Sequence, residues 1–250
     1  MKSSTHSIPT NGTHYRNLLS SCPHLLKSID SLATIATCDR GQEICRELHP
    51  AEYWHLVISG VVRRCVLRAD GRRQIVGLLL PGDFFGFTAG AEYDYTAEAV
   101  AEGTLLARYP RRRVETIADS DPNLARELRQ VTLEAMSRLQ TQLLTLGRIT
   151  VLEKVGSFIL EMETRLPHTL GNSIALPVSR YDIADYLAVS VETVSRSLTD
   201  LSQRGVIELL GTRMVKIVDR DALDGDHDEC LTRSKARTHG AATQVHAAAA

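Results

Sequence analysis

Residues 33–109 consist of short apolar runs separated by turns. Val57-Ile58 and Leu78–Leu80 are typical of strands, and Asp70-Gly71 is a hairpin signal because both residue types tolerate the backbone of a tight turn. Glycines at positions 60, 82, 86 and 103 mark further turns. Strands this short, at such regular intervals, predict a small all-β barrel or roll.

A long amphipathic helix is predicted to begin at Asp121-Pro122, because aspartate is a good N-cap and proline fits the first helical position. Apolar side chains then recur at steps of three and four: Leu124, Leu128, Val131, Ala135, Leu139, Leu143 and Leu146. Such a stripe can pack against the chain's own core or against the same helix of a second copy, and the pattern alone favours neither. Shorter helices are predicted over Leu18–Leu32 and Val151–Arg165.

Residues 176–205 have the pattern of two short helices joined by a tight turn. Ser179 and Asp182 resemble a capping box at the start of the first helix, with aspartate in place of the usual glutamate. The turn is Ala188-Val189-Ser190, where Ser190 can cap the second helix, and Gly205 ends that helix. Two helices with a three-residue turn form a helix-turn-helix, whose second helix typically enters the major groove of DNA.

The second helix carries Glu192, Ser195 and Arg196 on one face, because these residues are three and four positions apart. Arginine can donate two hydrogen bonds to guanine, glutamate can accept one from cytosine, and serine suits several bases. The alternative is that Glu192 and Arg196 form an ordinary surface ion pair, worth about 0.2–0.5 kcal/mol. The helix-turn-helix context favours base reading.

A two-stranded wing is predicted after the second helix, because residues 206–219 alternate in character around Gly211-Thr212. Basic and hydroxyl side chains near the second helix are candidates for contacts with DNA phosphates, although each is also an ordinary surface residue. These candidates are Arg180, Thr193, Arg204, Arg213 and Lys216.

The composition limits the possible functions. The formal net charge of the 250 residues is -1, so any DNA contact must come from a local basic patch. We expect a cytoplasmic location, because no apolar stretch could span a membrane and the polar N-terminus lacks a secretory signal. The five cysteines are an odd number and indicate reduced thiols. Since no catalytic triad, phosphate loop or metal-ligand spacing is found, we expect neither an enzyme nor a metal site.

The order of these parts resembles the CRP/FNR superfamily of bacterial transcription regulators over roughly residues 20–220. The most specific likeness is Glu192-Thr193-Val194-Ser195-Arg196, which matches the E-x-x-S-R pattern of the FNR/FixK branch. The resemblance implies an α+β fold with an N-terminal β-roll similar to cyclic-nucleotide-binding domains, a long dimerisation helix and a C-terminal winged helix-turn-helix. It also implies that the leucine stripe joins a homodimer, which binds a palindromic site in double-stranded DNA.

Members of this branch recognise inverted repeats of TTGAT-type half-sites. The resemblance therefore implies that Arg196 reads the guanine, Glu192 a cytosine and Ser195 a thymine. FixK-type members activate genes for microaerobic respiration, denitrification or nitrogen fixation, and the same role is implied here. Activation also requires contact with RNA polymerase, for which the Gly82–Gly90 loop is a candidate by analogy.

The sensing end differs from the well-known members. The segment GDFFGFTAGAEYDYTAEAV lacks the Arg-Ser pair of cyclic-nucleotide binders and carries Glu92 and Asp94, whose charges would repel a phosphate. The cysteines at positions 22, 38, 45 and 65 are too widely spaced for the iron–sulfur cluster of FNR. We therefore expect no cofactor. The alternative is a haem- or nucleotide-responsive sensor, with His14, His49 and His55 as the available haem ligands.

These patterns divide the chain into five expected parts. They are a disordered leader (1–16), a β-roll sensor-like domain (17–118), a dimerisation helix (119–148), a winged helix-turn-helix domain (149–220) and a tail (221–250). The tail is expected to be disordered because it is rich in charge and alanine and has no apolar period.

Overall fold

The computed structural model describes residues 27–167 and 173–224 of the chain. Contacts divide the chain into two compact units: residues up to 144 together with 181–188 form the first, and the remaining residues form the second. The expected leader, most of the predicted helix Leu18–Leu32 and the tail beyond residue 224 lie outside the described residues. The end of that helix is described as a 3-10 helix, η1 (Lys27–Leu32).

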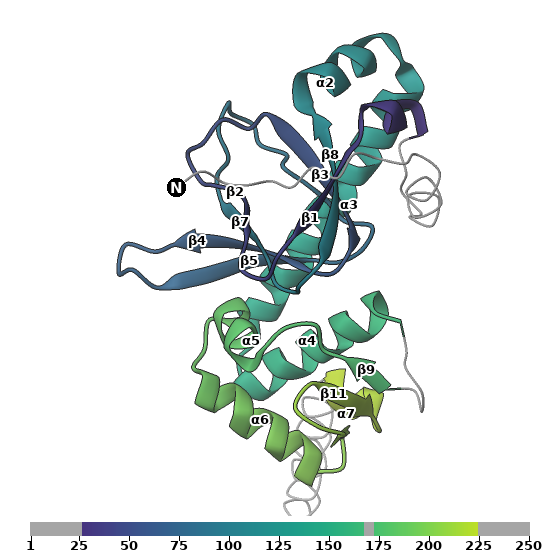
Figure 1. Cartoon of the computed structure of the whole chain (residues 1–250). Helices are drawn as coiled ribbons and strands as arrows, with labels where there is room; N and C mark the ends of the chain where they lie inside the picture. Colours follow the sequence, from purple (N-terminus) through teal and green to yellow (C-terminus); the bar gives the residue numbers. More distant parts are fainter. Residues whose placement is uncertain (1–26, 168–172, 225–250) are drawn as a thin grey trace, which may run out of the picture. The chain divides into compact units, whose positions relative to one another are not determined.

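The first unit contains two antiparallel four-stranded sheets (Figure 1). One has the strand order β1-β8-β3-β6 and the other has the order β2-β7-β4-β5. The strands are β1 (Thr34–Cys38), β2 (Glu43–Cys45), β3 (Tyr53–Ser59), β4 (Val62–Leu67), β5 (Arg73–Leu79), β6 (Phe84–Phe85), β7 (Thr96–Ala99) and β8 (Thr104–Pro110). The predicted β-roll is confirmed.

The hairpin between β4 and β5 turns where the sequence predicts it. Gly71 has a φ of +78°, a left-handed conformation that glycine adopts without strain. The Asp70 carboxylate accepts a hydrogen bond from the backbone N–H of Arg72 at 3.0 Å, which stabilises the turn.

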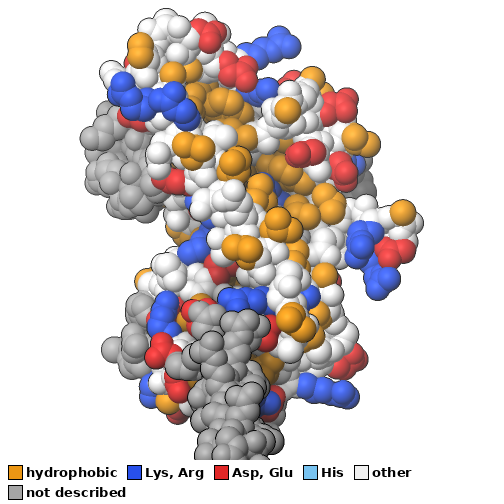
Figure 2. All heavy atoms as spheres, turned by 180° about the vertical axis from the view of Figure 1, so that it is seen from behind, with side chains coloured by type: hydrophobic (Ala, Val, Ile, Leu, Met, Phe, Trp, Pro, Cys, Tyr) orange, Lys and Arg blue, Asp and Glu red, His pale blue; other side chains and the backbone are white. Residues whose placement is uncertain are grey.

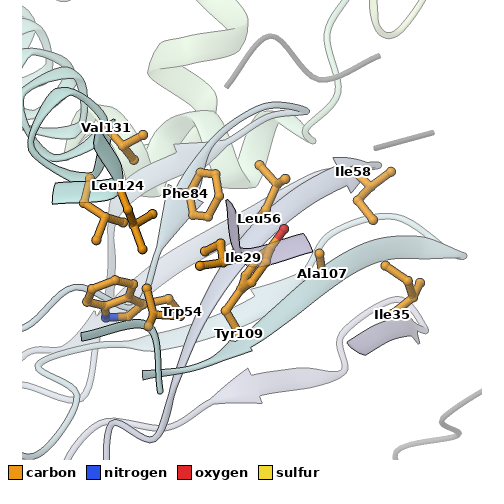
Figure 3. Close-up of a cluster of buried hydrophobic side chains, with 12 residues drawn as sticks. Ile29, Ile35, Trp54, Leu56, Ile58, Phe84, Ala107, Tyr109, Leu124 and Val131 are labelled. Atoms are coloured by element: carbon orange, nitrogen blue, oxygen red, sulfur yellow. The ribbon is translucent and has the colours of Figure 1, made fainter. Parts of the chain in front are cut away.

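The sheet containing β3 separates two hydrophobic cores, because successive side chains of a strand point to opposite faces. Trp54, Leu56 and Ile58 face a core that includes helical residues, whereas Val57 faces the core shared with the other sheet. Figure 3 shows the helix-side core, in which Leu124 and Val131 lie near Phe84. Continuous burial along β3 therefore reflects two covered faces.

Two helices follow β8: α2 (Arg111–Ser120) and α3 (Pro122–Gly147). The start of α3 is as predicted, because the Asp121 carboxylate accepts a hydrogen bond from the backbone N–H of Asn123 at 2.9 Å. Helix α2 was not predicted, because Pro110 precedes it without a capping side chain and Val114 is its buried residue.

The structure divides the apolar stripe of α3. Leu124, Leu128 and Val131 are buried in the helix-side core of their own chain. Further along the helix the stripe is exposed: 44% of Leu139 and 70% of Leu143 is accessible to solvent. Ala135 and Leu146 are partly buried. Only the later half of the stripe is therefore free to contact another chain.

The second unit contains α4 (Val151–Arg165), as predicted, with a capping box between Thr150 and Glu153. Its three-stranded sheet has the order β10-β11-β9 (Figure 1). The strands are β9 (Ser173–Ala175), β10 (Ile207–Leu209) and β11 (Met214–Ile217). The predicted wing is confirmed as β10 and β11, whereas β9 was not predicted.

A short helix, α7 (Arg220–Asp224), occupies the first positions of the expected tail. Leu223 is 3% exposed, and its carbonyl oxygen lies close to Gly156 of α4. The expectation of disorder is therefore wrong for residues 221–224, because one apolar side chain reaches a core that is distant in sequence.

Candidate nucleic-acid interface

Two helices with a short connection follow one another along the chain: α5 (Arg180–Leu187) and α6 (Val191–Gln203). Ala188 reverses the chain with a φ of +55°. The Ser190 hydroxyl then caps α6 by accepting a hydrogen bond from the backbone N–H of Thr193 at 3.2 Å. At the other end Gly205 has a φ of +72°, typical of a residue that ends a helix. The predicted helix-turn-helix is confirmed.

The two faces of α6 have opposite character. Val194, Leu198 and Leu201 are at most 3% exposed, so this face packs against the protein. On the opposite face, Glu192 and Arg196 are exposed and Ser195 is partly buried. The structure therefore brings the three candidate base-reading residues together on the outer side of the helix.

Sequence reasoning missed two residues of this surface. A shallow hollow of about 290 Å³ on α6 is lined by Ser195, Arg196, Thr199, Asp200 and Gln203. Thr199 and Gln203 follow Ser195 at steps of four, so helical spacing would have found them. The Thr199 hydroxyl already donates a hydrogen bond to the Ser195 carbonyl at 3.0 Å. Gln203 is therefore the better candidate for an additional DNA contact.

The candidate phosphate-contacting residues have different surroundings. Arg204 forms an ion pair with Asp200 at 2.8 Å, and Lys216 forms one with Glu208 at 3.1 Å. The Thr193 hydroxyl lies 2.8 Å from the Ser190 hydroxyl and so belongs to the cap of α6. Arg213 is exposed between the wing strands, and Arg180 is partly buried at the start of α5.

One argument against a cyclic-nucleotide site, the repulsion of its phosphate by Glu92 and Asp94, is not supported by the structure of the β-roll. Glu92 and Asp94 are exposed, so their charges do not face the interior. The alternate residues Tyr93 and Tyr95 are 5% exposed and lie in the core between the sheets, with ring centroids 6.4 Å apart. Tyrosine rings, rather than carboxylates, fill the roll here.

The cysteines that the structure describes are buried free thiols. Burial raises the pKa of Cys38, and it raises the pKa of Cys45 to about 12 and that of Cys65 to about 11. A thiol with such a pKa is protonated at neutral pH and reacts slowly. These three residues are reduced thiols, as expected, and are buried like small apolar side chains, while Cys22 and Cys230 lie outside the described residues.

Of the histidines named as available haem ligands, His49 is exposed, His55 is 1% exposed and His14 lies outside the described residues. Within residues 27–167 and 173–224, no cluster of three or more histidine, cysteine, aspartate or glutamate side chains could hold a metal ion. No helix in these ranges has the length and hydropathy to cross a membrane.

Two family models match the chain. Residues 36–121 match the cyclic nucleotide-binding domain, and residues 153–225 match the Crp-like helix-turn-helix domain. Together with the β-roll, the long helix and the exposed face of α6, these matches define a DNA-binding transcription regulator, and the chain belongs to the CRP/FNR family.

Within that family the chain belongs to the FixK branch. It is 43% identical over 198 residues to the nitrogen fixation regulation protein FixK of Azorhizobium caulinodans, covering 78% of this chain and 79% of that protein. It is 38% identical over 189 residues to FixK of Rhizobium meliloti, covering 76% and 85%. The solved structure of FixK2 from Bradyrhizobium japonicum is 38% identical, with a TM-score of 0.72 over 77% of this chain and 96% of that one.

Proposed function

We propose that this regulator binds a palindromic DNA site with TTGAT-type half-sites and activates genes for microaerobic respiration, denitrification or nitrogen fixation. The observation that supports it most directly is the outer face of α6, where Glu192, Ser195 and Arg196 lie opposite a fully packed face. Arg196 can donate two hydrogen bonds to guanine, and Glu192 can accept one from cytosine. Nitrogen fixation is supported by the relatives, which are named as nitrogen fixation regulators, and the other gene classes rest on the resemblance to the FixK branch.

Exposed apolar residues on α3 support a homodimer. Leu133, Met136 and Leu144 are 52%, 54% and 73% exposed, and they extend the surface of Leu139 and Leu143. Hydrophobic side chains reach the protein surface in Figure 2, and these five residues follow one another along a single helix. Since isolated apolar residues are common but continuous rows are not, we assign this row to the contact between two copies.

A second proposal concerns RNA polymerase. The Gly82–Gly90 segment includes Phe84 and Phe85, which are buried, so most of it cannot contact another protein. Ala89 and Gly90 are exposed and remain the part of this loop that we propose for the contact. The proposed role is binding and recruitment without catalysis, and a protein that acts on bacterial chromosomal DNA works in the cytoplasm.

The experiment is a fluorescence anisotropy titration with a labelled duplex carrying two TTGAT half-sites, with centres about one helical turn apart. Arg196→Ala should lose specific binding and approach the affinity for random DNA. Arg126→Ala, which removes the same charge from an exposed position on α3, is the control and should bind like the unmodified protein. Equal affinity of the Arg196→Ala variant and the unmodified protein would overturn the proposal.

A further inference from the structure

Two polar side chains face the interior of the β-roll at one point in the strand register. His55 of β3 lies directly opposite Arg108 of β8, and on its other side it lies opposite Phe85 of β6. Side chains directly opposite each other in an antiparallel pair are in contact range. Two residues along each strand, Val57 and Leu106 lie on the same face and belong to the core between the sheets.

His55 is buried without a hydrogen-bond partner. Its ring is 1% exposed and stacks on the Phe85 ring, with centroids 4.8 Å apart and planes 17° apart. Neither ring nitrogen has a partner among the described residues. Burial, followed by the positive charge of Arg108, lowers the pKa of His55 to about 3, so the ring is neutral. A neutral imidazole has one N–H donor and one acceptor.

Arg108 has open hydrogen-bonding capacity beside this ring. Its guanidinium lies over the Tyr53 ring, 4.2 Å from the centroid. Within the described part of the chain, its buried Nε has no acceptor. Buried polar groups are normally paired, and leaving them unpaired costs stability, so an unpaired donor next to an unpaired imidazole requires an explanation.

Both groups line a hollow of about 210 Å³ in the first unit. The lining residues are Glu43, Ile44, Cys45, Arg46, His49, Pro50, Glu52, Tyr53, His55, Tyr93 and Arg108. Glu43 is neutralised by Arg46, 2.9 Å away. The Tyr93 hydroxyl donates to the Tyr53 carbonyl at 2.8 Å. The unpaired donors of the two residues, the Arg108 Nε–H and the ring N–H of His55, are therefore buried in the wall of this hollow.

We propose that Arg108 and His55 form a binding site for a compact oxyanion inside the β-roll. A cation is disfavoured by the Arg108 charge, and a nucleotide is too large, since pockets for such ligands usually measure about 300–1,000 Å³. An oxyanion would accept from both donors, with the charge-assisted bond from arginine as the stronger contact. This inference rests on the geometry of the roll and does not depend on DNA binding.

The test uses the full chain and two probes, sodium phosphate and sodium nitrate, with sodium chloride at equal ionic strength as the reference. Thermal unfolding and the nitrogen resonances of the histidine rings are followed during titration. We expect at least one of the two probes to raise the unfolding temperature and shift the His55 resonances saturably. Arg108→Gln should weaken this binding at least roughly tenfold, because it removes the charged donor.

Two further variants separate binding from folding. His55→Phe should remain folded, because phenylalanine can stack on Phe85 and has no unpaired nitrogen, but it should lose the response to the anion. Arg126→Gln removes an exposed charge from α3 and should respond like the unmodified protein. The proposal is overturned if neither anion produces a response, or if the responses of Arg108→Gln and His55→Phe equal that of the unmodified protein.

Discussion

Arg196 and Arg213 carry the same charge, but their positions predict different contributions to DNA binding. Arg196 lies on the outer face of α6, so Arg196→Ala should lose about 1–3 kcal/mol of discrimination at the guanine. Arg213 lies in the turn of the wing, so Arg213→Ala should weaken binding to all sequences equally and reduce the salt slope by about one charge. Anisotropy titrations of specific and random duplexes at several salt concentrations measure both effects.

If Arg213→Ala changed the preferred base, Arg213 would contact a base and not a phosphate. If Arg196→Ala weakened specific and random binding by the same factor, Arg196 would contact a phosphate and not the guanine. The double variant should show the sum of the two effects, because the residues lie on separate elements and contact different parts of DNA.

His55 predicts a pH dependence of stability. Its pKa is lowered from 6.5 to about 3 in the folded protein, chiefly by burial and also by Arg108. The unfolded chain therefore binds more protons than the folded chain below pH 6.5, and the free energy of unfolding should fall as the pH drops from 6.5 toward 3. The loss from this group can reach about 1.4 kcal/mol per pH unit.

Urea unfolding of the unmodified protein and His55→Phe across this range isolates the effect. Because carboxylates titrate in both proteins, the difference between the two curves reports the histidine alone. The difference should grow steadily toward low pH. Parallel curves would show that the His55 ring is protonated in the folded protein or is accessible to water.

The residue scale also shows what a sequence can reveal about a site. Glu192, Ser195 and Arg196 were predictable because helical spacing alone puts them on one face. The environment of His55 was not predictable, because it depends on the register of β3 with two strands that are distant in sequence. Glu92 and Asp94 were expected to repel a phosphate in the roll, whereas they are exposed and Tyr93 and Tyr95 are buried instead.

At the scale of elements, local capping signals decided what could be predicted. The starts of α3 and α6 were recognisable because Asp121 and Ser190 each cap within a few residues. In contrast, α2 has no capping side chain, and β9 is a three-residue strand that forms by pairing with β11. Such an element depends on a partner that lies far along the chain.

The contact between α4 and α7 predicts that Gly156→Ala destabilises the protein, although alanine favours helix formation more than glycine does. Alanine normally stabilises a helix by about 1 kcal/mol relative to glycine. At Gly156, however, an added Cβ would lie 2.5 Å from the carbonyl oxygen of Leu223. Because backbone must move to relieve this clash, Gly156→Ala should lower the free energy of unfolding by about 1–3 kcal/mol.

Gly147→Ala is the matched control, because a Cβ at that end of α3 meets nothing within 4 Å. It should leave stability unchanged or raise it slightly. Thermal and urea unfolding of both variants test the prediction. Stabilisation by Gly156→Ala would mean that α7 does not pack against α4 in solution.

At the scale of the whole molecule, the order of roll, long helix and helix-turn-helix could be predicted from the sequence, since each part has its own periodicity. The partition of the α3 stripe could not. Leu128 and Leu143 occupy equivalent positions in the apolar pattern, but one is 9% exposed and the other 70%. Periodicity identifies the apolar face of a helix, whereas the surrounding fold determines what covers each turn of it.

This partition predicts which leucines hold two copies together. Leu143→Glu should convert the dimer to monomer, because dimerisation would bury an unpaired carboxylate. Leu67→Glu is the control: Leu67 is 71% exposed, like Leu143, but lies on β4. Size-exclusion chromatography with light scattering measures the mass, and circular dichroism verifies folding. Since a monomer contacts one half-site, Leu143→Glu should also lose its preference for the palindrome over a single half-site. If the Leu143→Glu variant stayed dimeric, the exposed apolar residues of α3 would not form the interface.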